Sequence, residues 1–184
     1  METQYKNIHQ ELIDLCREGN QKAQFQLYKL YYKPMYSVTL RIVNNEAEAE
    51  DVMQEAFLKA FRKIDTYLGE VSFGAWLKKI VVNRSLDHLK KKKVQFEEVS
   101  EHTMQLPDEN EEIGEVAVES IKKAIQSLPD GYRTVLSLYL IEGYDHDEIS
   151  GILGISNSAS RTQFSRAKNK LRELLKGKEI FTYN

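Results

Sequence analysis

Residues 153–175, "LGISNSASRTQFSRAKNKLRELL", concentrate side chains that could form hydrogen bonds with nucleic acid. Seven basic residues and one acidic residue lie between positions 156 and 178, a local charge of +6 in a chain of net charge −2. Arg can bind guanine and Gln can bind adenine through paired hydrogen bonds. Basic side chains further along the segment can bind the phosphates of the DNA backbone. We therefore predict that the segment binds DNA through an exposed face comprising Ser158, Ser160, Arg161, Gln163, Arg166, Lys168 and Lys170.

These side chains need a rigid support, and the preceding residues predict a helix-turn-helix. Asp145 and Glu148 can cap a short helix reciprocally, Ser150 is small enough for close helix contact, and Gly154 suits the turn. Ser156 or Ser158 can cap the second helix. The spacing of its apolar residues predicts a core-facing side made of Phe164, Ala167, Leu171, Leu174 and Leu175. The alternative, a basic face that only solvates an ordinary C-terminal helix, explains the charge but not the caps and the turn.

The chemistry of an enzyme or a metal centre is not indicated. The four histidines (His9, His88, His102 and His146) are scattered without metal-ligand spacing, and no Gly-rich phosphate loop is present. We expect His146 to face solvent in the first turn of its helix. The single cysteine, Cys16, is expected to be a buried apolar group in the first helix. We therefore predict no catalytic residue, metal or cofactor.

Charge divides the chain into parts. Residues 94–119 contain nine acidic residues and no Lys or Arg, which leaves the remainder of this 184-residue chain at +7. We interpret residues 94–114 as an acidic, flexible linker between two small helical domains, residues 1–93 and 115–184. The N-terminal residues lack the apolar core of a signal peptide, and no apolar run is long enough for a membrane span. The fold class is therefore all-α, and a cytoplasmic location without membrane insertion is expected.

The sequence predicts five helices in the first domain. Ile8, Leu12 and Leu15 are expected on the apolar face of the first, the second spans about residues 21–31, and Pro34 is expected to open the third. Asn45 and Glu48 resemble a capping box for the fourth helix. Its apolar stripe comprises Ala49, Val52, Met53, Ala56, Phe57, Ala60, Phe61 and Ile64. Ser72 is expected to cap the fifth helix, in which Phe73 and Trp76 are predicted to be core residues.

Two segments resemble a known family. "YYKPMYSVTLRIVNNEAEAEDVMQEAFLKAFRKI…FGAWLKKIVVNRSLDHLKKKK" resembles region 2 of extracytoplasmic-function (ECF) sigma factors of the sigma-70 family. "LPDGYRTVLSLYLIEGYDHDEISGILGISNSASRTQFSRAKNKLREL" resembles their region 4. The resemblance implies a transcription initiation factor that binds core RNA polymerase, at the clamp helices of its largest subunit and at its flap. It further implies reading of the −10 and −35 promoter elements, assistance in DNA opening, and an anti-sigma factor as a plausible partner.

The resemblance assigns roles to the two surfaces of the first domain. On the fourth helix, a polar stripe with one exposed Leu is expected to dock on polymerase: Asp51, Gln54, Glu55, Leu58 and Arg62. The fifth helix and the loop before it are expected to contact the −10 element, through Tyr67, Ser72, Lys79, Asn83, Arg84, Asp87, His88, Lys90 and Lys91. Region 4 would read the −35 element, although Gln163 departs from the Arg that the family often has.

Because the linker is acidic, it is predicted to occupy the basic RNA-exit path of polymerase. The alternative function is a stand-alone helix-turn-helix regulator whose N-terminal bundle senses a ligand or dimerises.

Overall fold

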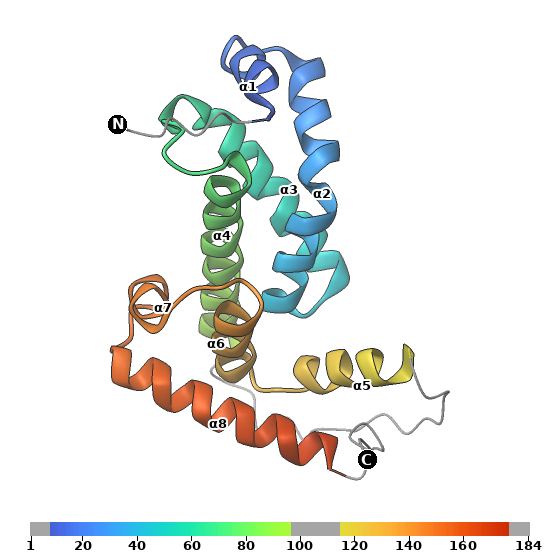
Figure 1. Cartoon of the computed structure of the whole chain (residues 1–184), viewed down its shortest axis with the longest axis vertical. Coiled ribbons are helices and arrows are strands. Elements are labelled where there is room, and N and C mark those ends of the chain that lie inside the picture. Colours follow the sequence, from blue (N-terminus) through green and yellow to red (C-terminus); the bar gives the residue numbers. More distant parts are fainter. Residues whose placement is uncertain (1–7, 97–114, 177–184) are drawn as a thin grey trace. The chain divides into compact units, whose positions relative to one another are not determined.

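The computed structural model describes residues 8–96 and 115–176 and contains no strand within those ranges (Figure 1). The chain separates into two compact units, Met1–Glu97 and Glu98–Asn184. Most of the acidic stretch predicted as a linker, residues 97–114, lies outside the described residues. Every helix in the described ranges is too short or too polar to cross a lipid bilayer.

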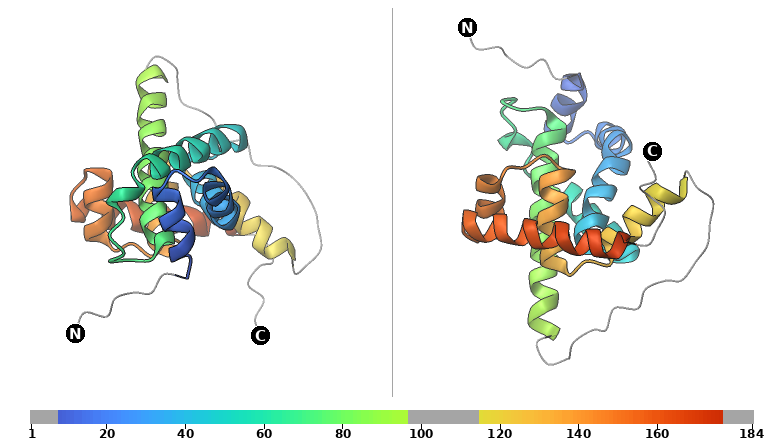
Figure 2. Two further views of the ribbon diagram at one scale, coloured as in Figure 1. Left: turned by 90° about the horizontal axis from the view of Figure 1, so that it is seen from above. Right: turned by 60° about the horizontal axis from the view of Figure 1, so that its bottom comes forward.

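The N-terminal unit is a bundle of α1 (Gln10–Arg17), α2 (Gln21–Val43), α3 (Glu46–Arg62) and α4 (Phe73–Phe96), with a 3₁₀ turn η1 (Ile64–Thr66) after α3. Helices α2, α3 and α4 contact one another along their lengths (Figures 1 and 2). The predicted stripe on α3 faces this core: Ala49, Val52, Met53, Ala56, Phe57 and Ala60 are buried. Helix α4 ends three residues beyond the predicted boundary at position 93.

The prediction of separate helices before and after Pro34 is wrong, because α2 runs unbroken from Gln21 to Val43. A proline inside a helix loses one backbone hydrogen bond. Here the buried face continues on both sides of it, with Leu27 before Pro34 and Met35, Val38 and Ile42 after it. Packing of this continuous face stabilises the helix across the proline.

The predicted apolar face of α1 is wrong for Ile8 and Leu15, whereas Leu12 is half-buried. The buried residues are Ile13 and Cys16, whereas Ile8 is 89% exposed and Leu15 is 39% exposed. Ile8 precedes the first helical residue, Gln10, so helical periodicity does not place its side chain over the core. The expected burial of Cys16 is confirmed, and burial raises the pKa of its thiol.

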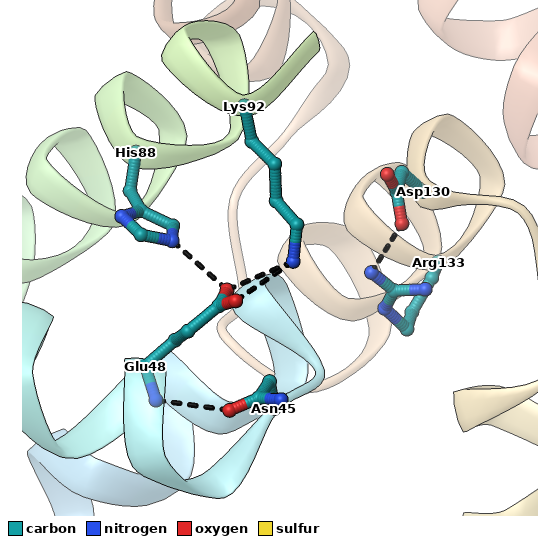
Figure 3. A network of polar contacts seen from close by, with 6 residues as sticks. All are labelled: Asn45, Glu48, His88, Lys92, Asp130 and Arg133. Carbon is teal, nitrogen blue, oxygen red and sulfur yellow. Dashed lines mark hydrogen bonds and ion pairs between the residues drawn. The ribbon is translucent and has the colours of Figure 1, made fainter. Parts of the chain in front are cut away.

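Local signals set the starts of α3 and α4. The Asn45 side chain accepts a hydrogen bond from the Glu48 backbone nitrogen (3.0 Å), and Ser72 Oγ accepts one from the Ala75 nitrogen (3.2 Å). Both predicted N-caps are confirmed. The reciprocal arm of the predicted capping box is replaced, because the Glu48 carboxylate binds α4 instead (Figure 3).

The C-terminal unit contains α5 (Glu115–Gln126), α6 (Asp130–Leu140), α7 (His146–Leu153) and α8 (Asn157–Leu175). Its core is formed by Leu128, Leu136 and Ala167, against which Phe164, Leu171 and Leu174 pack. The predicted core-facing side of α8 is therefore confirmed. At the start of α6, the buried Arg133 donates a hydrogen bond to the Leu128 carbonyl (2.9 Å). It donates a second one to the Asp130 carboxylate (2.7 Å) (Figure 3).

Candidate functional site

Helices α7 and α8 form the predicted helix-turn-helix. Asp145 and Glu148 make both arms of a capping box, at 2.8 and 2.9 Å. Gly154 ends α7 in the left-handed conformation (φ +68°), which glycine adopts without steric cost. Ser156 Oγ then accepts from the Ala159 nitrogen (3.1 Å) and caps α8. The N-terminal turns of α8 are thereby held at the end of a rigid turn.

The first two turns of α8 present an exposed polar face. Ser158 and Arg161 are exposed. Arg161 Nε donates to Asn157 Oδ1 (2.7 Å), and Asn157 Nδ2 donates to Asp147 Oδ1 on α7 (2.5 Å). The guanidinium is therefore oriented by a chain of hydrogen bonds that begins in α7. Guanidinium donors at the start of a helix fit the major-groove edge of guanine.

Two predictions on this surface are wrong. Ser160 is fully buried, and His146, expected in solvent, is only 9% exposed. The spacing contained the signal, because Ser160 lies four residues before Phe164 and seven before Ala167, on the core-facing side of α8. His146 is buried because its ring stacks on Tyr139 (ring centroids 4.6 Å apart) and contacts Phe164.

The remaining candidate residues on α8 differ in their exposure and in their contacts. Arg166 is exposed. Lys168 Nζ lies 4.7 Å from the centroid of the Phe164 ring, and Lys170 Nζ lies 3.3 Å from Glu173. Gln163 is half-buried and leans toward α6, with its Oε1 placed 3.6 Å from where a Cβ on Gly131 would lie. The long side chains of Arg166, Lys168 and Lys170 can carry their charged groups to DNA phosphates.

On α3 the structure brings the predicted polymerase-docking residues onto one exposed ridge. Asp51, Gln54, Glu55 and Arg62 are exposed, and Leu58 between them is 57% exposed. Residues three and four apart share a helix face, so these side chains form a continuous surface opposite the buried stripe. A ridge with one protruding Leu among polar groups suits contact with another helix.

Polar residues of α4 form two separate stripes. Arg84, His88 and Lys92 face α3, where Arg84 binds Glu55 and the other two bind Glu48. Figure 3 shows the Glu48 carboxylate between His88 (3.0 Å) and Lys92 (2.8 Å). The second stripe is exposed and comprises Lys79, Asn83, Asp87, Lys90 and Lys91. Of the predicted −10 residues on α4, Arg84 and His88 are thus paired with carboxylates of α3.

The loop between η1 and α4 corrects one prediction and adds two residues. Tyr67 is 2% exposed and lies among Phe73 and Trp76, with its hydroxyl donating to the Val71 carbonyl (2.7 Å). It therefore supports the loop and does not present its ring to a ligand. The exposed apolar side chains of this loop are instead Leu68 (77% exposed) and Val71 (49% exposed). The sequence did not predict their exposure, because an irregular loop has no periodicity that assigns side chains to a face.

Comparison with known proteins assigns the chain to a family. Residues 27–94 match sigma-70 region 2, and residues 119–171 match sigma-70 region 4. The ECF sigma factor SigW of Bacillus subtilis is 30% identical over 177 residues, which cover 89% of this chain and 95% of SigW. The chain belongs to the ECF sigma factors of the sigma-70 family. The ECF sigma-E factor of Escherichia coli K12 is 27% identical over 184 residues, covering 91% of this sigma factor and 96% of that one.

Solved structures agree on the fold. RpoE of Bartonella quintana, in complex with the anti-sigma factor NepR, superposes with a TM-score of 0.58 at 24% identity, over 83% of this chain and 96% of RpoE. CnrH, in complex with the cytosolic domain of CnrY, gives a TM-score of 0.51 at 24% identity, over 91% of this chain and 96% of CnrH.

The protein is thus a transcription initiation factor that binds core RNA polymerase and directs it to promoter DNA. The alternative of a stand-alone regulator is not favoured, because the N-terminal bundle matches region 2.

Proposed function

We propose that three separate surfaces divide the work of this sigma factor. The exposed ridge of α3 docks on the clamp helices of polymerase, the exposed stripe of α4 with the preceding loop contacts the −10 element, and α8 reads the −35 element. Residues 1–93 and 115–184 would then be the two functional domains, and residues 94–114 the connection between them.

The observation that carries the proposal is the arrangement of α7 and α8. A left-handed Gly154 and a capped α8 leave Arg161 exposed and oriented at the start of the second helix. That is the position from which a recognition helix contacts base edges. Arg166, Lys168 and Lys170 lie further along α8, where contact with phosphates would set the register without reading sequence.

The −10 surface has a different composition that suits unpaired DNA. Lys79, Lys90 and Lys91 supply positive charge along α4, and Asn83 supplies a donor and an acceptor. Leu68 and Val71 are exposed apolar groups in the loop that leads into this helix. Apolar side chains can contact bases that have left the stack, while cations hold the backbone.

The polymerase surface is proposed from its exposure and chemistry. Asp51 and Gln54 precede Leu58 by seven and four residues on the same face of α3, and more than half of Leu58 is exposed to solvent. Burying such a Leu in a helix-on-helix contact gives affinity, and the surrounding polar groups give orientation.

Other aspects of the role follow from the family. The protein would supply specificity to polymerase without catalysis of its own and without a cofactor, and would act in the cytoplasm. Two structural relatives were solved in complexes, RpoE with the anti-sigma factor NepR and CnrH with the cytosolic domain of CnrY. An anti-sigma factor is therefore proposed as a partner of this chain.

Transcription in vitro tests the proposal. Core polymerase without its own sigma factor is incubated with genomic fragments, with and without this protein, and the 5′ ends of the transcripts are sequenced. Selective starts preceded by shared sequences near −10 and −35 are expected only in its presence. Transcripts that start equally randomly in both reactions would refute the assignment.

A further inference from the structure

His146 connects the three helices α6, α7 and α8 at one buried point. Its Nδ1 lies 2.8 Å from Ser160 Oγ, and both side chains are buried. The imidazole stacks on Tyr139 of α6 and meets Phe164 of α8 edge-on, and the Tyr139 and Phe164 rings also contact each other (centroids 4.5 Å apart). His146 is the first residue of α7, so the start of α7 is tied to a defined point on α8.

The next residue of α7 makes a second connection to α8. Asp147 accepts a hydrogen bond from Asn157, which in turn accepts one from Arg161. His146 and Asp147 therefore hold two neighbouring positions of α8, Ser160 from within the core and Arg161 at the surface. Since Ser160 and Arg161 are adjacent, a shift at Ser160 moves the side chain proposed to read bases.

We propose that His146 and Ser160 form a positioning pair that sets the base-reading geometry of α8. The inference rests on the proposed role of α8 in −35 recognition. A buried hydrogen bond fixes both distance and direction between two helices, whereas an apolar contact tolerates sliding. Loss of one partner leaves the other polar atom buried and unpaired, which favours a displaced helix that restores contact with water. We therefore expect the variant protein to discriminate less between DNA sequences even under conditions where it remains folded.

Isosteric variants separate the hydrogen bond from packing. Thr and Val have nearly the same shape. Ser160→Thr keeps the hydroxyl and adds one methyl group, whereas Ser160→Val has the same bulk as Thr but lacks the hydroxyl. On the partner, His146→Asn places a polar atom near the position of Nδ1, and His146→Leu is its apolar match. Ser137→Ala is the control, because Ser137 Oγ is buried in the same unit and has no hydrogen-bond partner among the described residues.

The measurement uses holoenzyme assembled from core polymerase and the full chain. Duplex promoters randomised around −35 are selected with the wild-type holoenzyme, and the ratio of affinities for the selected duplex and a duplex with a scrambled −35 segment is determined for each variant. Ser160→Val and His146→Leu are expected to lower this ratio roughly tenfold relative to Ser160→Thr and His146→Asn, at temperatures where circular dichroism shows folded protein. Ser137→Ala should keep the wild-type ratio.

Equal ratios within each isosteric pair would overturn the inference, because packing alone would then matter at these positions. If both Ser160 variants fail to fold, the His146 pair decides by the same comparison. If the wild-type holoenzyme selects no −35 sequence, or if Arg161→Ala does not change the ratio, the assignment of α8 itself fails, and the positioning pair with it.

Discussion

Arg84 of α4 binds Glu55 of α3 in the N-terminal unit, with Nε 2.7 Å from Oε2. The pair joins a residue predicted to contact the −10 element to one predicted to contact polymerase. The Arg84 side chain is 21% exposed and the Glu55 side chain is 53% exposed, so solvent screens the attraction. The pair is therefore expected to orient side chains more than to stabilise the bundle.

A double-mutant cycle of Arg84→Ala and Glu55→Ala measures this directly. Because the pair is partly exposed, the coupling free energy is expected to be about 0.3–1 kcal/mol and to decrease with added salt. Urea unfolding followed by fluorescence of Trp76, the single tryptophan of the chain, reports on the N-terminal unit. A coupling above about 2 kcal/mol would mean that the pair behaves as a buried ion pair.

The contacts of Glu48 predict a pH-dependent stability. Hydrogen bonds from Lys92 and His88 hold the pKa of the Glu48 carboxyl below its ordinary value, although partial burial acts in the opposite direction. A carboxyl whose pKa is lowered on folding contributes stability above its unfolded pKa, and this contribution is lost as the pH falls through the folded pKa. Glu48→Gln should therefore destabilise the bundle near pH 7, and the difference from wild type should shrink below about pH 4.

The same fluorescence-detected unfolding, repeated across this pH range, provides the measurement. Glu70→Gln, in the exposed loop before α4, is a suitable control and should show little difference from wild type at any pH. A Glu48→Gln penalty that stays constant down to about pH 3 would contradict the prediction.

Asp51→Lys should abolish binding to core polymerase and leave the fold unchanged. Asp51 is exposed on α3, so the charge reversal disturbs no core contact but places a cation on the proposed docking ridge. Co-elution with core polymerase in size-exclusion chromatography measures binding, and circular dichroism measures helix content. Glu11→Lys on α1 makes the same kind of charge reversal away from the ridge. Retained co-elution of Asp51→Lys would exclude α3 as the docking surface.

Arg161 and Lys170 should differ in what their removal changes. Arg161→Ala is expected to relax base preference at one or two −35 positions, since it removes base-edge donors. Lys170→Ala should weaken binding to every sequence similarly and lower the slope of log affinity against log salt by about 0.9, the value of one phosphate contact. Holoenzyme binding to selected and scrambled duplexes over a salt series distinguishes the two. An unchanged salt slope for Lys170→Ala would remove it from the phosphate contacts.

The parts of the structure that the sequence predicts are those with partners close along the chain. Asn45, Ser72 and Ser156 each cap the backbone nitrogen three residues ahead, and Gly154 ends α7 through its own φ angle. The apolar stripes of α3 and α8 follow from helical periodicity alone. Because such signals need no knowledge of neighbouring helices, the all-α fold and the helix-turn-helix could be predicted from residue types and spacing.

Tertiary packing decided which polar residues remain at the surface. Ser160 meets His146 from 14 residues away, Arg84 meets Glu55 from 29, and His88 meets Glu48 from 40. These residues lie at the edges of apolar faces, where the crossing of two helices determines whether a side chain is covered or exposed. Residue types and spacing therefore predicted the all-α class, the main N-caps and the basic segment of α8, because these depend on neighbours along the chain. The unbroken α2 and the choice of exposed side chains were decided by the packing of the helices, because burial depends on residues far away in the sequence.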